Sequence, residues 1–489
     1  MYIVTMTIYT PNLDGRIGPK YRVIADAVND DIHDGTLTAG TKLPTHRDLA
    51  YRLSVTVGTI TRAYAELQRR GLAGGKVGSG TYVIDLAQER RVFPTPIDMQ
   101  RQILTRSDNS VLHDYPDDGT IDLSMNRPPP GPEAEALAKT LADISQANGL
   151  DVLTQYNPAP GLTHHRQAMG SLLNTLDLDA DSEDIILTSG AQHAMAACAL
   201  GLLKAGDVLL TESLTYPGMT SLAAHMGARV RPVAMDEYGI LPDALDAAVR
   251  ETGARVVYVM PVHQNPTTAT MDAQRLKDIA EVALRHSLIV IEDDVYGFQP
   301  EHREPPLAQL IPDNTVYING FAKSISPGLR VGCMRVPKSL FATLTRSVQV
   351  TGWMIPPLMG EIATRWITSG VAQEIIAWHR AEMIARNRMA TEILRDFDFA
   401  SKPESLHLWL ELPNTHHADD IIRQLNQRGV IMVGPESFIT TQTTVPRALR
   451  LCLGSAPTRD QLRTVLMHVR TVLSTEPIQA QALVGSMVM

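Results

Sequence analysis

Cysteine, aromatic residues and long apolar runs are all scarce in this chain of 489 residues. The cysteines, Cys198, Cys333 and Cys452, stand far apart in apolar surroundings. That spacing argues against a disulfide framework and is typical of small core residues in a reducing cytosol. No run of about 18 or more uncharged apolar residues occurs, so we expect no transmembrane helix. The first residues lack a basic segment followed by an apolar core, so we expect no signal peptide and a cytoplasmic protein.

Metal ligands are also not apparent, because the pairs His164-His165 and His416-His417 lack partners at ligand spacing. The length predicts two or three domains. The net charge is −9, but residues 16–91 hold 12 Lys and Arg against 8 Asp and Glu, a local balance of +4. The sequence therefore predicts a basic module on an acidic body.

The basic module has the pattern of a helix-turn-helix. Apolar residues from Arg16 onward recur at helical spacing until Asp34-Gly35, and Thr45 is placed to cap a short second helix that ends near Leu53. A third helix is expected from about Val57 to Gly71. Its outward residues are small or basic and suit a major groove; they are Gly58, Thr59 and Arg62. A glycine-rich stretch, residues 74–83, reads as a two-stranded wing.

This order of helices and wing resembles the GntR family of transcription regulators. The resemblance implies that Arg47, in Leu43-Pro44-Thr45-His46-Arg47, contacts DNA. It assigns the same role to Arg62 in the recognition helix and to the wing glycines Gly78 and Gly80, while Thr45 keeps the hydroxyl of the usual serine. The alternative is a three-helix module that binds nothing, with its arginines merely solvated.

A proline-rich, polar stretch separates this module from the rest. We predict a DNA-binding domain at 14–86, a linker at 87–120, a body at 121–475 and a tail at 476–489. Within the body a smaller C-terminal domain is expected from about residue 356. The body alternates apolar runs with helical stretches, which predicts an α/β fold with a mostly parallel sheet covered on both faces. The predicted strands are 184–188, 208–212, 229–233, 255–260, 288–292, 315–319 and 331–336, with helices at 192–203, 241–251 and 271–286.

Ligands bind such sheets at the carboxyl ends of strands, so those positions matter most. After the first strand, Ser189, Gly190 and Ala191 open a helix whose free amides would hold an anion, although a serine N-cap explains the motif equally. After the second comes Tyr216, placed to stack on a flat ring, although a core tyrosine is the commoner fate. Asn265 lies in an Asn-Pro turn and could donate to a phenolate oxygen.

Asp293 comes directly after the next predicted strand, and Tyr296 follows three residues later. A carboxylate there could keep a pyridine nitrogen protonated, although many such acids only cap the next helix. Lys323 follows the strand after that, and Pro327-Gly328 bends the chain before Arg330. Burial makes a lysine a nucleophile towards an aldehyde, and an arginine binds a phosphate bidentately. An aldehyde and a phosphate on one molecule describe pyridoxal 5′-phosphate.

These strand ends, in this order, resemble fold-type I pyridoxal-phosphate enzymes of the aspartate aminotransferase group. The resemblance implies that Lys323 forms the internal aldimine and that Asp293 pairs with the pyridine nitrogen. The other cofactor contacts it implies are Tyr296 and Asn265 to the ring hydroxyl, Tyr216 to the ring face, Ser189, Gly190, Ala191 and Arg330 to the phosphate, and Tyr156 to the phosphate of a neighbouring subunit. Arg450 matches the arginine that clamps a substrate α-carboxylate.

Two positions depart from that pattern. Gly320 stands where the family usually has a serine, which removes a phosphate hydroxyl. Thr268 stands where the family's Asn-Pro turn usually has a glycine.

A GntR-like module before an aminotransferase-like body resembles the MocR-type regulators, which are head-to-tail homodimers. This implies a DNA-binding regulator that senses an amino compound, or pyridoxal phosphate itself, through Lys323. Two alternatives remain open: a working amino-acid aminotransferase with an appended GntR-like domain, and a storage or structural body, in which Arg450 would be idle.

Overall fold

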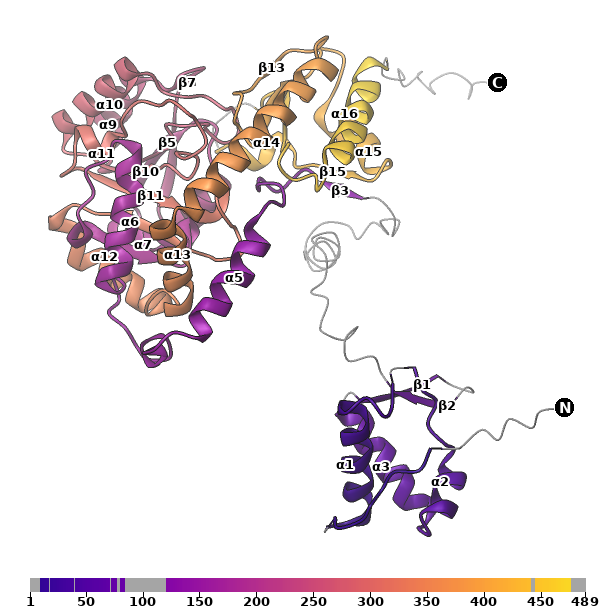
Figure 1. Cartoon of the computed structure of the whole chain (residues 1–489). Helices are drawn as coiled ribbons and strands as arrows, with labels where there is room; N and C mark the ends of the chain where they lie inside the picture. Colours follow the sequence, from indigo (N-terminus) through magenta and orange to yellow (C-terminus); the bar gives the residue numbers. More distant parts are fainter. Residues whose placement is uncertain are drawn as a thin grey trace, which may run out of the picture. The chain divides into compact units, whose positions relative to one another are not determined.

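A computed structural model describes residues 9–16, 18–38, 40–70, 72–76, 80–83, 120–440 and 445–475. The chain forms two units, Met1–Asp108 and Asn109–Met489, and each is described by itself (Figure 1). The division falls inside the predicted linker. That linker, apart from Thr120, and the predicted tail lie outside the described residues, so the predicted domain boundaries stay predictions.

The first unit contains the three predicted helices and the predicted wing. Its elements are α1 (Lys20–His33), α2 (His46–Arg52), α3 (Val57–Arg69), β1 (Ala73–Lys76) and β2 (Gly80–Val83). Thr45 caps α2 as predicted, since its hydroxyl accepts from the backbone N–H of Asp48 at 3.2 Å. The first helix starts at Lys20 rather than near Arg16, because Gly18 has φ +142° and Pro19 is the N-cap.

A single apolar cluster holds this unit together. Ile24, Leu49, Ile60 and Leu67, which come from all three helices, are fully buried in it. The Tyr64 hydroxyl donates to the backbone oxygen of Pro44 at 2.8 Å, which ties α3 to the segment before α2. The strands β1 and β2 pair antiparallel, with Ala73 opposite Val83. The helix-turn-helix therefore has a core of its own.

The second unit alternates strands and helices over most of its length. The large-domain elements are α5 (Glu133–Ser145), α6 (Thr163–Leu173), β4 (Ile185–Thr188), α7 (Ala191–Leu202), β5 (Val208–Glu212), α8 (Pro217–His225), β6 (Arg229–Val233), β7 (Met235–Asp236), β8 (Gly239–Ile240), α9 (Pro242–Thr252), β9 (Val256–Val259), α10 (Ala273–His286), β10 (Ile289–Asp293), α11 (Leu307–Leu310), β11 (Thr315–Gly320), β12 (Gly332–Arg335), α12 (Lys338–Gly352) and α13 (Pro357–Ser369). The remaining elements are β3 (Ile121–Asp122), α14 (Val371–Ile393), β13 (Phe399–Ala400), β14 (Leu408–Glu411), α15 (Ala418–Asn426), β15 (Val430–Ile431), β16 (Ala448–Leu451) and α16 (Arg459–Ser474).

Seven strands form the central sheet in the order β4-β12-β11-β10-β9-β5-β6. Strand β12 is antiparallel to both of its neighbours, and the other pairings are parallel. The predicted mostly parallel sheet is therefore confirmed, and each predicted strand lies within about two residues of an observed one.

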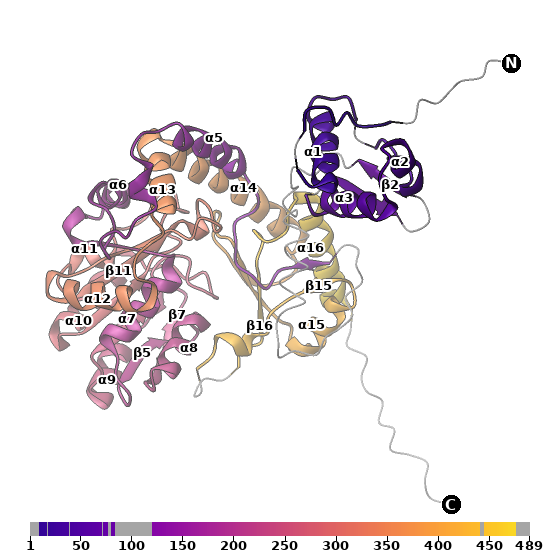
Figure 2. The same ribbon diagram turned by 90° about the horizontal axis from the view of Figure 1, so that it is seen from below.

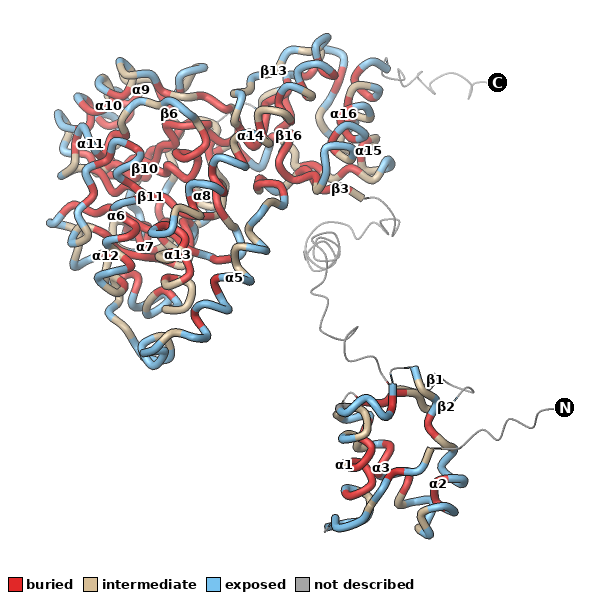
Figure 3. The backbone as a smooth tube through the Cα atoms, in the orientation of Figure 1, coloured by how far each residue is buried: buried red, intermediate tan, exposed pale blue. Residues whose placement is uncertain are grey.

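Alternate residues of these strands enter apolar clusters on opposite faces of the sheet, as the period of a strand requires. Ile186, Val316 and Met334 lie in the core that α7 and α12 cover. Their neighbours Leu187, Tyr317 and Cys333 lie on the opposite face with α6 and α13. The buried residues of Figure 3 follow this sheet and its covering helices. Burial on both faces explains why the strands are almost entirely apolar.

The large and smaller domains are connected at two places along the chain. Helix α13 packs on α6 through Ile362 and Trp366. Helix α14 runs from α13 into the part that holds α15, α16 and β16 (Figures 1 and 2). Near the start of the second unit, β3 pairs with β15 of the smaller domain. The first described strand of this unit therefore lies in the smaller domain, before the chain forms the large domain.

Among the residues that the structure describes, no helix has the length and apolar character needed to cross a membrane.

Candidate cofactor site and nucleic-acid interface

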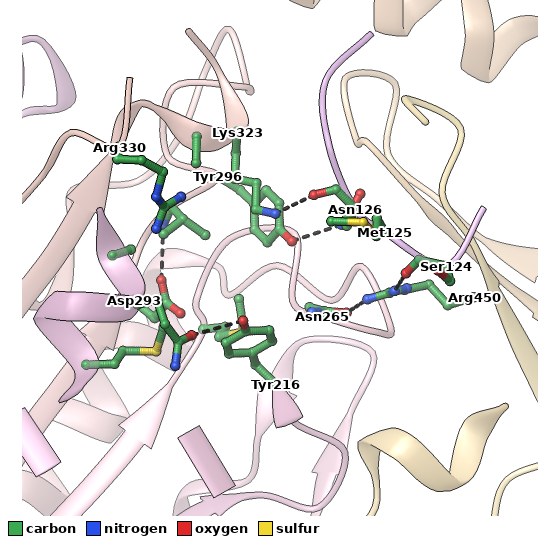
Figure 4. A pocket seen from close by; sticks show the side chains of 16 residues that line it. Ser124, Met125, Asn126, Tyr216, Asn265, Asp293, Tyr296, Lys323, Arg330 and Arg450 are labelled. Atoms are coloured by element: carbon green, nitrogen blue, oxygen red, sulfur yellow. Dashed lines mark hydrogen bonds between the residues drawn. The ribbon is translucent and has the colours of Figure 1, made fainter. Parts of the chain in front are cut away.

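A pocket of about 300 Å³ lies at the carboxyl ends of the parallel strands (Figure 4). It brings together residues from five strand ends and from the smaller domain. The predicted site residues that line it are Ala191, Tyr216, Asn265, Asp293, Tyr296, Lys323, Arg330 and Arg450. The pocket thus gathers residues that lie up to 326 positions apart in the sequence, from Ser124 to Arg450. The rule that ligands bind at strand ends finds them because parallel strands end at one edge of the sheet.

Lys323 is in a single helical turn, Phe321–Lys323, directly after β11. Its Nζ donates to the backbone oxygen of Asn126 (Figure 4). Burial, and then the positive charge of Arg450, lower the pKa of Lys323 to about 8. An appreciable fraction of this amine is therefore unprotonated near neutral pH, which is the form that attacks a carbonyl.

Asp293 ends β10 and is 1% exposed. Its Oδ2 accepts from the Tyr258 hydroxyl at 2.5 Å, and its Oδ1 faces the backbone N–H of Val295 at 3.4 Å. Burial raises the pKa of Asp293 to about 6 although these hydrogen bonds oppose the shift. The group is mostly a carboxylate at pH 7, and its Oδ1 has capacity for a further donor.

Asn126 and His407 contribute to this pocket, and the sequence analysis missed both. The Asn126 Nδ2 donates to the Tyr296 hydroxyl at 2.9 Å and lies 2.8 Å from His407 Nδ1. Burial and the charge of Arg450 hold the pKa of His407 well below its usual value, so the ring is neutral. Nδ1 then accepts, and Nε2 donates to the backbone oxygen of Gln264 at 3.2 Å. These bonds connect the segment after β3, the smaller domain and the turn before Asn265.

Arg330 lies against the start of α7, next to the pocket wall. Its Nη2 donates to the Ser189 backbone oxygen at 3.3 Å. A Cβ added to Gly190, which has φ +86°, would lie 2.6 Å from the same Nη2. The predicted anion site needs one correction, because the Ser189 N–H donates to His193 Nδ1 at 3.1 Å and is not free. The N-terminal end of α7 and the guanidinium of Arg330 still lie next to each other, and both attract an anion.

Arg450 on β16 faces the pocket from the smaller domain. Its Nη1 donates to Asn265 Oδ1 at 2.7 Å, and its Nη2 donates to the backbone oxygen of Ser124 (Figure 4). The guanidinium lies 4.7 Å from the ring centre of Phe438. Its buried Nε has no hydrogen-bond partner within the described part of the chain. Arg450 and Asn265 therefore form one hydrogen-bonded group, which the sequence analysis treated as two separate sites.

The structure gives a physical reason for one departure from the family pattern and a cost for the other. A Cβ at Gly320 would lie 2.9 Å from the Val331 backbone oxygen, so no serine fits there without movement of the backbone. Thr268 has φ +63°, a region that glycine adopts freely and that a β-branched residue adopts at a cost.

Tyr156 does not line the pocket. Its side chain is 82% exposed, and its ring centre lies 5.6 Å from that of Trp353. Its role toward a neighbouring subunit stays a prediction.

The first unit presents a basic face at the start of α3. A recess of about 370 Å³ there is lined by Lys20, Tyr21, Thr56, Gly58, Thr59 and Arg62. Arg47 and Arg62 are exposed, and neither has a hydrogen bond or ion pair within the described residues. Arg69 and Arg70, by contrast, both pair with Glu66, at 2.7 and 2.9 Å. The guanidinium groups of Arg47 and Arg62 therefore have no partner in the described part of the chain and can bind an external anion.

The other residues predicted to contact DNA are Thr45, Gly78 and Gly80. The Thr45 hydroxyl donates to the Asp48 carboxylate at 2.6 Å, so it already has a partner in its own cap. Gly80 has φ +106° at the start of β2, and Gly78 lies outside the described residues.

The sheet, its two covering layers and the lysine-bearing pocket define the class: a fold-type I α/β protein of the aminotransferase type, with a winged helix-turn-helix at its N-terminus. The chain belongs to the aminotransferase class I and II family, whose model matches residues 118–469. Residues 20–83 match the model of bacterial regulatory proteins of the gntR family. The fold class and the combination of modules predicted from the sequence are thereby confirmed, and the family implies pyridoxal 5′-phosphate as the cofactor.

Relatives of known sequence share the whole arrangement. The HTH-type transcriptional regulator YdeF of Bacillus subtilis strain 168 is 25% identical over 465 residues, which covers 95% of this chain and 96% of the relative. The regulator YjiR of Escherichia coli K12 is 26% identical, with coverage of 88% and 94%. Among solved structures, an archaeal alanine:glyoxylate aminotransferase superposes with a TM-score of 0.69 at 19% identity, covering 84% of this chain and 98% of that one.

Proposed function

We propose that this protein is a cytoplasmic transcription regulator that binds DNA through its winged helix and senses a small amino compound through its cofactor pocket. The observation that carries the proposal is the pair of free, exposed arginines, Arg47 and Arg62, in a module that matches the gntR family. Relatives that align over nearly the full length are named as transcriptional regulators, which supports the same conclusion.

The N-terminal turn of α3 would enter the major groove. Gly58 and Thr59 are small enough for close approach, and Arg62 lies one turn further along the same face. Arg47 at the start of α2, together with Gly78 and Gly80 of the wing, would contact the backbone. Phosphate contacts of this kind fix the register of the protein, and Arg62 would supply base readout.

The pocket fits pyridoxal phosphate, because an amine, a buried carboxylate with capacity for a further donor and a guanidinium at a helix N-terminus surround one space. Lys323 would attach the cofactor, Asp293 would accept from its ring nitrogen, and Arg330 with Gly190 and Ala191 would bind its phosphate. Tyr216 would cover the ring, while Tyr296 and Asn265 would bind the ring hydroxyl. When bound, the cofactor supplies a carbonyl for amines and an electron sink.

Arg450 would bind the carboxylate of the amino compound. A ligand carboxylate could replace Asn265 Oδ1 as the acceptor for Arg450 Nη1. It could also accept a hydrogen bond from Arg450 Nε, which has no partner within the described residues. The other lining residues of the pocket include Met125, Met195 and Met260, and the only basic side chains among the described lining residues are Lys323, Arg330 and Arg450. We therefore favour a ligand with one carboxylate and a neutral side chain; pyridoxal phosphate itself is the other candidate effector.

A homodimer would complete this site. Tyr156 is 82% exposed beside Trp353 and Val350, which are 52% and 68% exposed, and exposed apolar side chains of this size support a protein interface. In a head-to-tail dimer Tyr156 would reach the cofactor phosphate of the partner.

Footprinting of the full-length protein upstream of its own and neighbouring genes tests the regulator assignment. We expect specific protection, and a loss of affinity of about 5- to 150-fold for Arg62→Ala, as for one base-contacting arginine. Arg69→Ala is the matched control, because it removes the same charge from the other end of α3 at a residue paired with Glu66. Absence of specific protection across these regions would refute the assignment.

A working aminotransferase is the second candidate, since Lys323, Asp293 and Arg450 share one pocket. The loaded protein would then convert a panel of amino acids to keto acids and be regenerated by a second keto acid. A spectral response to amino acids without turnover supports sensing instead.

A further inference from the structure

A cluster of three side chains outside the cofactor pocket joins α6 to α13. His164 and His165 lie in the first turn of α6, and Glu361 lies in the second turn of α13, 196 residues later. One ligand atom from each residue lies within 4.8 Å of the others. The sequence analysis found the histidine pair but no partner for it, because the carboxylate comes from a distant helix.

The geometry around the carboxylate does not match that of ordinary ion pairs. Both histidine Nε2 atoms face the same oxygen, Glu361 Oε2, at 3.4 Å from His164 and 3.3 Å from His165. Charge-assisted hydrogen bonds between nitrogen and carboxylate usually measure about 2.7–2.9 Å. Two ligands of a tetrahedral zinc ion, each about 2.0–2.1 Å from the metal, lie about 3.3–3.4 Å apart. The two observed separations correspond to two edges of such a tetrahedron, and the ligand atoms of the two histidines lie within 4.8 Å of each other.

The surroundings of the cluster hold two of the ligands in place. Glu361 Oε1 accepts from Arg365 Nε at 2.7 Å, which orients the carboxylate and leaves Oε2 for the histidines. The His165 side chain is 1% exposed, and a Cβ at Gly360 would lie 2.7 Å from its Nδ1, so only glycine leaves room for this ring. The His164 side chain is 53% exposed, so water can reach the cluster and occupy a fourth ligand position.

We propose that His164, His165 and Glu361 form a divalent-metal site that takes Zn²⁺ and joins α6 to α13. Two imidazoles and one carboxylate are ligands that zinc accepts, and an open fourth position suits a bound water. Because α6 follows the loop that carries Tyr156, the metal would also stabilise the segment assigned to the dimer contact. The contacts that indicate this metal site do not depend on the proposed regulatory function.

Zinc binding by the full-length protein tests this site. The protein is treated with a chelator, dialysed against ZnCl₂ and then against buffer, and its metal content is measured by mass spectrometry. We expect the wild type to retain one more zinc ion per chain than His164→Ala or Glu361→Gln, with binding at least about tenfold weaker in each variant. His417→Ala is the matched control, since His417 is the exposed member of the second histidine pair, which belongs to no such cluster among the described residues.

Cobalt gives a second readout at the same site. Co²⁺ bound in tetrahedral geometry should produce intense visible absorption in the wild type and in His417→Ala, but not in His164→Ala, whose exposed side chain can be removed without loss of the fold. Equal zinc retention and equal cobalt spectra in the wild type and in His164→Ala would overturn the proposal.

Discussion

Replacement of Gly190 by alanine should weaken cofactor binding through contact with Arg330. The added Cβ would lie 2.6 Å from Arg330 Nη2 and 3.0 Å from its Cζ, so the guanidinium must move. Gly190 also has φ 86° and ψ 166°, a conformation almost restricted to glycine. Such backbone strain costs about 1–3 kcal/mol of folding stability.

The effect on the cofactor follows from the loss of one charge-assisted contact to its phosphate. Such a contact contributes about 1.5–3 kcal/mol, which corresponds to a loss of affinity of roughly 10- to 150-fold. Gly149→Ala is the control, because Gly149 has φ +77° but no atom within 4 Å of an added Cβ. It should lower stability by about 1–2 kcal/mol and leave cofactor affinity unchanged.

Equilibrium dialysis against pyridoxal phosphate, with denaturant unfolding in parallel, separates the two effects. Wild-type affinity in Gly190→Ala would refute the assignment of Arg330 to the phosphate. Equal losses of affinity in both variants would instead show that backbone strain alone, and not the position of the guanidinium, controls binding.

Three further predictions concern stability and protonation. Thr268→Gly should raise the free energy of unfolding by about 1 kcal/mol, because it relieves a positive φ, and a decrease in urea unfolding experiments would contradict this. Burial lowers the pKa of His263 in the folded protein to about 4. As the pH falls, this histidine is therefore protonated in the unfolded chain before it is protonated in the folded protein. Stability should then decline between about pH 6.5 and 4, by up to about 3 kcal/mol, and His263→Gln should flatten this decline. The rate at which pyridoxal phosphate becomes attached, followed by borohydride trapping and mass spectrometry, should rise with pH through about 8 and be absent in Lys323→Ala; a rate that is flat from pH 6 to 9 would contradict the environment assigned to Lys323.

The positions of Lys323, Asp293 and Asn265 could be predicted from the sequence because each lies at the carboxyl end of an apolar strand or within six residues after it. Parallel strands end at one edge of a sheet, so local pattern and a general rule suffice to bring these residues together. The helix-turn-helix was predictable for a similar reason, since Thr45 and the apolar spacing of α3 are local signals.

The residues that the sequence analysis missed depend on contacts between distant segments. Asn126 reaches the pocket because β3 pairs with β15 of the smaller domain, more than 300 residues later. His407, in the smaller domain, forms a hydrogen bond with Asn126. Glu361 joins the histidine pair only because α13 packs on α6. No local pattern in any of these segments indicates its partner.

The central claim is that the winged helix and the cofactor pocket act as one regulatory device. The affinity of the full-length protein for its protected DNA fragment, measured by fluorescence anisotropy with and without bound cofactor, tests this claim most directly. Coupling between two sites typically changes affinity by about 5- to 150-fold. We predict a change in this range for the wild type and none for Lys323→Ala. The same DNA affinity in the loaded and cofactor-free wild type would contradict the account.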